Sequence, residues 1–265
     1  MRFYSIASGS SGNCIYIGSD CTHVLVDVGI SGKRIIEGIN NASIDTKDID
    51  GILITHEHSD HVKSVGMLTR KYGIPVYATQ GTINAIRNMP TLGNVDDQLL
   101  NVIRPDEKFT IKDMEIRAVK TSHDAADSVA YRVKCDDKKA GVVTDLGVFN
   151  DYTVDCFAGC DVILAETNHD VKMLECGPYP YQLKKRILGD RGHLSNENGG
   201  RLISRLLHDN MKHVFLGHLS FENNMPELAY ETVRLEIEAS DTPYHGNDFE
   251  ITVAKRDFPS TLIEF

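Results

Sequence analysis

Short apolar runs separated by small polar residues make up most of the first third of the chain. Runs rich in Ile and Val that stop at glycine, serine or asparagine are typical of β-strands joined by turns. Between two such runs, apolar residues recur at helical spacing from Ile35 to Ile39, which predicts a short amphipathic helix with Ser31 as its N-cap. A second helix is predicted over residues 62–72, ending at Gly73. The strands predicted in this part are 3–7, 14–17, 24–28, 52–55 and 75–78.

The rest of the chain repeats this mixture of strands and helices. Because no long linker, low-complexity tract or clear repeat interrupts it, we expect a single domain over residues 1–265. Strands and helices in two comparable halves indicate two sheets packed face to face with helices outside, an α/β or α+β fold. The further predicted strands are 108–111, 114–121, 129–135, 140–144, 162–165 and 214–216, and the further helices are 196–208 and 226–239.

Composition narrows the cellular setting. No apolar run approaches the roughly 18 residues that a bilayer crossing needs, so no membrane partner is expected. The start of the chain, "MRFYSIASGSSGNC", turns polar after one short apolar run and does not resemble a signal peptide. Six cysteines without a CxxC pair suit buried or reduced thiols. We therefore expect a cytoplasmic protein.

Acidic side chains outnumber basic ones, 38 to 28, which gives a net charge of -10. Affinity for nucleic acid usually comes from basic surface that displaces counterions, so this chain is not expected to coat nucleic acid non-specifically. A local basic patch or bound metal ions could still provide the positive charge for such a substrate.

The stretch "HEHSDH", directly after the predicted strand 52–55, is the strongest chemical signal in the chain. His56 and His58 are two residues apart in an extended loop and project to the same side. Asp60 and His61 begin the next helix, so we expect their side chains to turn toward a neighbouring point. Two adjacent ligand pairs of mixed nitrogen and oxygen type fit two divalent ions better than one. Further ligand-type residues that follow apolar runs are His123, Asp145 and His218.

A lone histidine is more often a solvated or core residue than a ligand. Five histidines and two aspartates that all follow apolar runs are much harder to explain in that way. "THEHSDH" matches the HxHxDH signature of the metallo-β-lactamase superfamily, and His123, Asp145 and His218 match its later ligands in order. "VLVDVG" resembles the first motif of the superfamily, with Asp27 at the strand end. The resemblance covers the whole chain. It implies a four-layer αββα sandwich with a two-metal site at one edge.

The resemblance also implies a role for each residue. The first metal is expected on His56, His58 and His123, the second on Asp60, His61 and His218, with Asp145 bridging them. The ions are Zn, Mn or Fe, since imidazole and carboxylate ligands accept all three. A hydroxide held between two such ions attacks an electrophilic carbonyl or phosphorus. Asp27 is expected to support the ligand loop rather than only to cap a turn, and Glu57 is expected to point into solvent.

The substrate class is narrowed by the segment between Asp145 and His218. It is too short for the cap domain of the β-CASP nucleases, and Asp145 stands where β-lactam hydrolases typically have Cys or no bridging carboxylate. "AETN" with Glu166 and "HLS" with His193 partly resemble the HEAT and HST elements of tRNA 3′-processing nucleases. Glu166 and His193, together with Asp60, are therefore the predicted catalytic residues. Ser195 is better explained as a helix cap.

Two segments are candidates for substrate binding. The glycine- and serine-rich loop at 8–13 could approach the metals and hold phosphate through its backbone N–H groups, although a plain hairpin turn has the same composition. The basic stretch before His193 combines aromatic and cationic residues, which suits nucleic acid, although most charge runs are solvated helix faces. The predicted contacts are Ser8, Ser10, Ser11, Asn13, Lys184 and Lys185.

"SIASGSSGNCIYIG" and "GHLSNENGG" resemble the YycJ/WalJ/VicX branch of the superfamily. That resemblance implies a 5′→3′ exonuclease acting on duplex DNA ends in DNA repair. An RNA nuclease or small phosphodiesterase, and a glyoxalase-type thioesterase, are the alternatives within the superfamily. A non-catalytic regulator is a further alternative, against which the intact ligand set argues. The sequence leaves a homo-oligomer open.

Overall fold

The computed structural model describes all residues, 1–265, and has two seven-stranded mixed sheets. In spatial order the first sheet consists of β14 (Ile263–Glu264), β1 (Arg2–Ala7), β2 (Cys14–Gly18), β3 (His23–Val26), β4 (Gly51–Leu53), β5 (Val76–Thr79) and β6 (Leu100–Ile103). The second consists of β13 (Ile251–Val253), β12 (His213–Gly217), β11 (Val162–Glu166), β10 (Lys138–Val143), β9 (Val129–Cys135), β8 (Met114–Lys120) and β7 (Lys108–Ile111).

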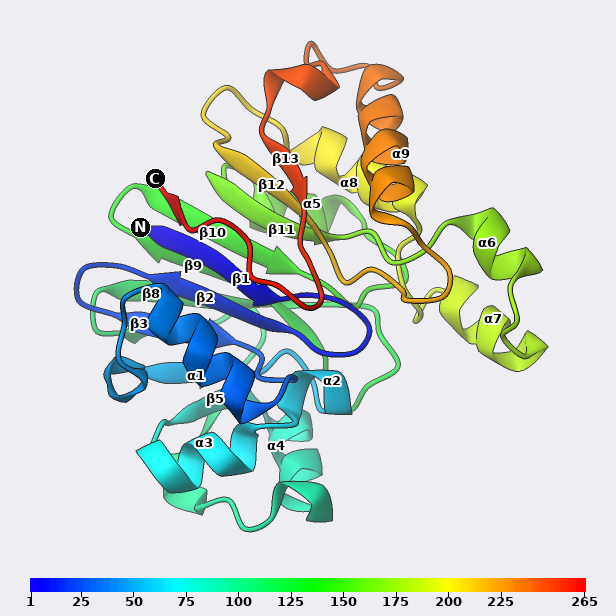
Figure 1. Ribbon diagram of the computed structural model, residues 1–265. Coiled ribbons are helices and arrows are strands. Elements are labelled where there is room, and N and C mark those ends of the chain that lie inside the picture. Colours follow the sequence, from blue (N-terminus) through cyan, green and yellow to red (C-terminus); the bar gives the residue numbers. More distant parts are fainter.

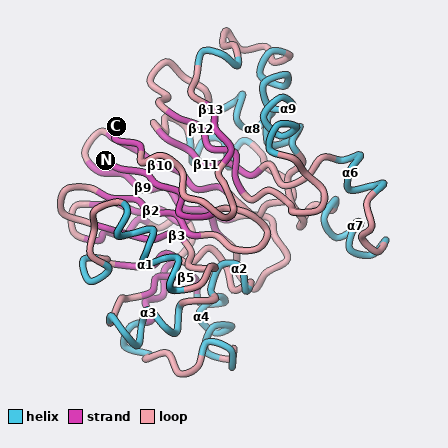
Figure 2. The backbone as a smooth tube through the Cα atoms, viewed as in Figure 1, coloured by secondary structure: helices cyan, strands magenta, loops and turns pink.

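Helices form the two outer layers (Figure 1). Those of the first half are α1 (Gly32–Asn41), α2 (Ser59–Val62), α3 (Val65–Tyr72) and α4 (Gln80–Arg87). Those of the second half are α5 (Asp151–Phe157), α6 (Val171–Cys176), α7 (Tyr181–Leu188), α8 (Asn196–Leu206) and α9 (Pro226–Glu238). Short 3₁₀ turns are η1 (Thr46–Asp48), η2 (Pro90–Leu92), η3 (Asp97–Leu99) and η4 (Gly246–Asp248). Figure 2 shows the strands between the two helical layers, with α6 and α7 projecting to one side.

Three apolar clusters hold these layers together. One lies between the sheets and includes Phe3 stacked on Phe215 with ring centroids 5.3 Å apart. The other two include buried residues of α1, α3 and α4 and of α5, α8 and α9, respectively. A helix buries one stripe and an inner sheet buries both faces, so this order of layers is the αββα sandwich that the sequence predicted. The two sheets share one of these cores, and a single domain over residues 1–265 stays a prediction.

The parallel part of each sheet determines where a site can form. Strands β3 to β6 are paired in parallel, as are β10 to β13. Parallel strands need helical crossovers, and their carboxyl ends meet at one edge, where loops collect polar groups. Asp27 and the HEHSDH loop follow strands of the first sheet, whereas Asp145 and His218 follow strands of the second.

Most predicted elements form close to their expected bounds. Ser31 caps α1 by accepting a hydrogen bond from the backbone of Arg34, and Gly73 ends α3 in the left-handed region at φ 68°. The single helix predicted over residues 62–72 was wrong, because the chain forms α2 and α3 with a break at Lys63 and Ser64. There the backbone N–H of Ser64 donates to the carbonyl of Val28 at 2.9 Å instead of continuing the helix.

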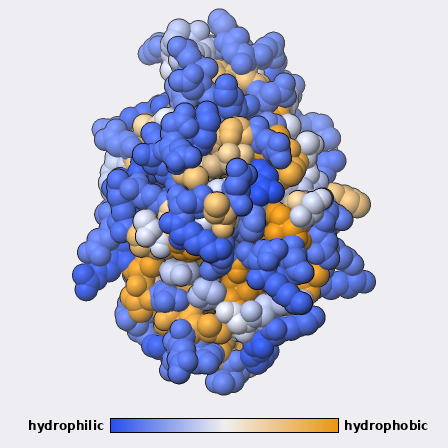
Figure 3. Space-filling view, turned by 90° about the vertical axis from the view of Figure 1, so that its left-hand side faces the viewer, coloured by the Kyte–Doolittle hydropathy of each residue, from blue (hydrophilic) through white to orange (hydrophobic).

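The cysteines form no disulfide, and all six are free thiols. None of the helices combines the length and the apolar character that a bilayer crossing requires. On the face shown in Figure 3, polar residues predominate and apolar residues form smaller patches between them.

Candidate metal centre

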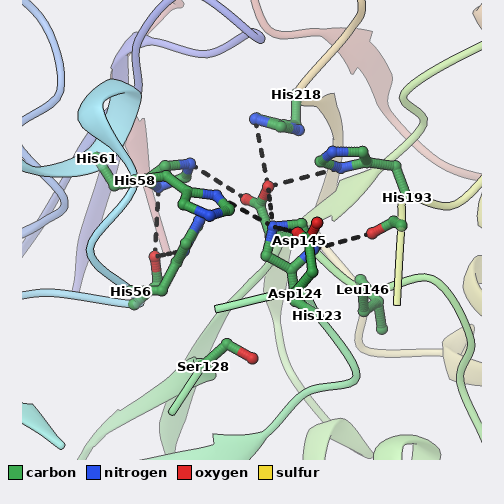
Figure 4. A network of polar contacts seen from close by, with 12 residues as sticks. His56, His58, His61, His123, Asp124, Ser128, Asp145, Leu146, His193 and His218 are labelled. Atoms are coloured by element: carbon green, nitrogen blue, oxygen red, sulfur yellow. Dashed lines mark hydrogen bonds and ion pairs between the residues drawn. The ribbon is translucent and has the colours of Figure 1, made fainter. Parts of the chain in front are cut away.

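The seven predicted ligands lie together at the edge where the parallel strands of both sheets end. Figure 4 labels all of them except Asp60. Six of the seven form two groups, and the possible ligand atoms within each group lie within 4.8 Å of one another. The first group is His56, His58 and His123, and the second is Asp60, His61 and His218.

Asp145 lies between the two groups. One of its carboxylate oxygens is 3.3 Å from Nε2 of His61. The other is 3.6 Å from Nε2 of His218 and 3.8 Å from Nε2 of His123. A carboxylate with oxygens directed toward both groups has the placement expected of a bridging ligand.

Three residues at this edge have left-handed backbone conformations although none is glycine. Asp27, Asp145 and His218 have φ values of 59°, 59° and 58°. Each follows the end of a strand: Asp27 comes after β3, Asp145 after β10 and His218 after β12. Such conformations cost on the order of 1 kcal/mol or more each and are concentrated at functional sites.

Hydrogen bonds fix the ring orientation of the histidines through Nδ1. His61 donates from Nδ1 to Asp27 at 2.7 Å, His123 to the carbonyl of Gly192 at 2.9 Å, and His218 to Glu166 at 3.0 Å. With Nδ1 protonated, the lone pair of a neutral imidazole is on Nε2, which in all three rings faces the site. The bond from His61 confirms the predicted support by Asp27.

Thr55 extends this arrangement to His56. Its hydroxyl donates to Asp27 at 2.9 Å and accepts from Nδ1 of His56 at 3.0 Å. Nε2 of His56 is then buried without any hydrogen-bond partner, as is Oδ2 of Asp145. Buried polar atoms rarely lack a partner. Two such atoms inside a histidine and carboxylate cluster fit a centre that binds divalent metal, with these atoms among its ligands.

The pKa shifts divide the proposed histidine ligands. At His61 and His218 burial would lower the pKa, but the neighbouring carboxylates outweigh it and raise the pKa, so metal binding would displace a proton from these rings. At His56 and His123 the pKa shift has the opposite direction. Burial lowers the pKa of His56 well below its ordinary value, and the neighbouring histidines lower it further. Burial also lowers the pKa of His123. Neutral imidazole is the form that coordinates a metal ion.

Glu166 and His193 lie beside the second group. Nδ1 of His193 donates to Oε1 of Glu166 at 2.8 Å and lies 3.5 Å from Asp145. Glu166 is fully buried and also accepts hydrogen bonds from the backbone of Leu146 and Leu194. Burial raises the pKa of Glu166, but the charge and hydrogen bonding of His193 and His218 outweigh this and hold the pKa below its ordinary range. An ionised Glu166 therefore orients both imidazoles.

The loop at 8–13 packs against the centre. Ser8 and Asn13 are buried: the hydroxyl of Ser8 accepts from the backbone N–H of His218 at 2.9 Å, and the side chain of Asn13 bonds to Gly9. Both side chains therefore hold the loop and its neighbours in place. Ser10 and Ser11 are exposed.

Lys184 and Lys185 lie on α7 of the projecting pair of helices. Lys184 donates to the carbonyl of Glu175 at 2.8 Å and so ties α7 to α6, whereas Lys185 is exposed. Ser195 caps α8 by accepting from the backbone of Asn198, as the sequence analysis favoured.

One expectation was wrong. Glu57 does not simply point into solvent, because its Oε1 accepts a hydrogen bond from the backbone of Ala126 at 2.8 Å. This bond ties the HEHSDH loop to the loop that carries His123. It joins the two sheets next to the first ligand group.

Several supporting residues escaped the sequence analysis. Thr55 adjoins the HEHSDH motif and was a recognisable candidate. Asn168, which donates to the carbonyl of His218 at 2.8 Å, gave no comparable signal. Nor did the ion pair between Asp124 and Arg186, which joins the loop after His123 to α7.

Comparisons with known proteins agree with this geometry. The family model for the beta-lactamase superfamily domain matches residues 22–218. The chain is 39% identical to the exodeoxyribonuclease YycJ of Bacillus anthracis, over 99% of this chain and 98% of that protein. It is 41% identical to the exodeoxyribonuclease WalJ of Streptococcus pneumoniae, over 99% of this chain and 97% of that protein.

Among solved structures, the metallo-β-lactamase fold protein YhfI from Bacillus subtilis superposes with a TM-score of 0.72 at 16% identity, over 98% of both chains. This likeness shows the fold. The chain therefore belongs to the metallo-β-lactamase superfamily and, within it, to the YycJ/WalJ family.

Proposed function

We propose that this protein is a metal-dependent phosphodiesterase, an exodeoxyribonuclease that degrades duplex DNA from a 5′ end. The observation that carries the proposal is the His193–Glu166 pair, held at 2.8 Å beside the two ligand groups. A centre that only bound metal would not need a further oriented imidazole. The relatives named as exodeoxyribonucleases support DNA as the substrate.

Two divalent ions, Zn, Mn or Fe, are proposed on the seven ligand residues. When bound, they supply Lewis acidity toward a phosphate and a water that deprotonates near neutral pH. The protein's own groups do the rest. Buried carboxylates balance the charge of the centre, and the Nδ1 partners keep each ligand ring in one orientation.

His193 is the proposed acid or phosphate ligand. Its Nδ1 is bound to Glu166 and its side chain is 17% exposed, so the rest of the ring can reach a substrate. Because Nδ1 is bonded to Glu166, Nε2 is the ring atom that can contact a phosphate oxygen or exchange a proton with a leaving oxygen. Asp60, 24% exposed at its side chain, and His58 are the two ligands that are not fully buried.

The proposal is tested with purified protein, added Zn²⁺, Mn²⁺ or Fe²⁺, and DNA labelled at either the 5′ or the 3′ end. Duplex DNA, single-stranded DNA and RNA of the same length are compared at one salt concentration. We expect mononucleotide release from the 5′ end of duplex DNA. Shortening from the 3′ end would contradict the polarity, and a preference for RNA would favour the RNA nuclease alternative.

A role in DNA repair, a cytoplasmic location and a homo-oligomer remain predictions. The thioesterase alternative would be favoured by hydrolysis of a glutathione thioester in the same preparations. His193 and Glu166 have no evident role in that reaction.

A further inference from the structure

A hollow of about 470 Å³ opens beside the candidate metal centre. Its volume lies within the roughly 300–1,000 Å³ common for ligand pockets. Ser8, whose hydroxyl is bonded to the backbone of His218, contributes to its wall. Leu219 and Ser220, which follow His218 directly in the chain, contribute as well. The hollow therefore begins one residue beyond a proposed metal ligand.

Two aromatic rings line this hollow and are left largely in water. Phe221 is 70% exposed and Phe258 is 69% exposed. A large aromatic ring gains free energy when it is covered, and every nucleobase offers a flat face that stacks on such a ring. Two exposed phenylalanines in one pocket next to a phosphodiesterase site suit a base.

Arg256 holds one of these rings in place. Its guanidinium lies over the ring of Phe221, 4.7 Å from the centroid, and its Nη2 donates to the carbonyl of Leu219 at 2.9 Å. The Nε atom of Arg256 is buried and has no hydrogen-bond partner. This nitrogen lies next to the glycine- and serine-rich loop, 3.1 Å from the position of a Cβ added at Gly9.

The polar groups of the hollow suit a nucleotide better than a purely apolar ligand. Lys255 and Arg256 provide positive charge for a backbone phosphate. Glu227 and Asp257 also line the hollow, and carboxylates accept hydrogen bonds from the amino groups of bases. An apolar peptide would give none of these four charged groups a new partner.

We infer that this hollow receives an unstacked nucleobase of the DNA strand, from a nucleotide close to the phosphodiester at the metal centre. The inference rests on the proposed function and specifies how that site selects its substrate. Taking a base out of a duplex costs a few kcal/mol in the interior and least where the base is already unpaired. Strand ends fray, so a pocket for an unstacked base favours cleavage at an end.

Binding in the absence of added metal tests the pocket. The probes are 5′-phosphorylated oligothymidylates, either complete or with an abasic site at one of the first three nucleotides. Their binding is measured by fluorescence anisotropy in the presence of a chelator. The wild type should bind the complete strand roughly tenfold or more tightly than one of the abasic strands, the scale of base stacking on an aromatic side chain. Phe221→Ala and Phe258→Ala should lose this discrimination. Leu235→Ala removes another exposed apolar side chain, on α9, and should keep it.

The outcomes separate the pocket from the nuclease activity. If no abasic position weakens binding, or if both phenylalanine variants discriminate as the wild type does, the pocket assignment is wrong, even when the enzyme degrades DNA. If binding depends on the base but the metal-loaded wild type does not cleave DNA, the pocket assignment stands and the nuclease proposal is wrong. A dimer that Phe221→Ala dissociates, with no base dependence, would assign this face to a second copy of the chain.

Discussion

Four of the five proposed histidine ligands depend on a partner at Nδ1, and those partners differ in kind. Asp27 and Glu166 are buried carboxylates, Thr55 is a hydroxyl, and the partner of His123 is a backbone carbonyl. Only side-chain partners can be proposed from a sequence. The sequence indicated Asp27 as a support of the ligand loop and Glu166 only as a catalytic residue beside His193, whereas the carbonyl of Gly192 could be found only from the folded chain.

The position of Asp145 between the two ligand groups makes it the most informative single substitution. We expect Asp145→Ala to lose both metal and activity, because an oxygen ligand shared by two ions would be removed. Elemental analysis of the purified wild type should approach about two metal ions per chain, the content of a two-metal site. Full metal content and activity in the variant would exclude the bridging role. Asp145→Asn, of nearly equal size, controls for a cavity in the fold.

His193 should affect the chemistry without affecting the metal. General acid–base groups contribute about 10²–10⁴-fold to a rate, so His193→Ala should slow turnover by a factor in that range at unchanged metal content. The matched control is His245→Ala, since His245 is exposed and pairs with Glu238 at 2.8 Å outside the centre. Wild-type turnover in His193→Ala would make His193 an ordinary surface residue. Protonation of the leaving oxygen also predicts that the loss becomes smaller for a substrate with a better leaving group.

At the scale of elements, the sequence was most informative where a strand repeats its pattern without interruption. The prediction for residues 129–135 matches β9, and Ser31 and Gly73 end their helices as expected. The short strands β13 and β14 were missed, because two or three residues carry too little periodicity. The break between α2 and α3 was missed because it depends on a hydrogen bond from Ser64 to a distant strand end.

A substitution on helix α7 tests whether this helix contacts DNA. Lys185 is exposed on it, whereas Lys184 is already bonded to α6. Lys185→Ala should weaken DNA binding about equally for all sequences and should reduce the slope of log K against log salt by about 0.9, the effect of one phosphate contact. Lys212→Ala is the control, because Lys212 precedes β12 at the end of the strand remote from His218. An unchanged slope in Lys185→Ala would remove this residue from the binding surface.

At the scale of the whole molecule, the centre requires that the two sheets keep a fixed relative position, since each supplies part of the ligands. Glu57 joins the sheets next to the site, and the core around Phe3 and Phe215 joins them in the middle. At the opposite end, Asp113 in the β7–β8 turn accepts hydrogen bonds from Ser19 and Thr22 in the β2–β3 turn. No sequence pattern indicated this last link, because its partners are far apart in the chain.

The link through Asp113 predicts how the stability of the molecule depends on pH. The hydrogen bonds from Thr22 lower the pKa of Asp113, burial partly opposes this, and Ser19 lowers it further. A carboxylate whose pKa is lower in the folded state stabilises above the unfolded-state pKa, about 3.9 for Asp, and loses that contribution as the pH falls through the folded-state pKa. Asp113→Ala should therefore cost about 1 kcal/mol near pH 7, because these bonds are partly exposed, which lowers the melting temperature of a chain of this size by roughly 2–4 °C. Melting curves of both proteins from pH 7 down to about pH 3 provide the measurement, and their difference should shrink below about pH 4. A difference that stays constant over this range would show that Asp113 acts through packing and not through its charge.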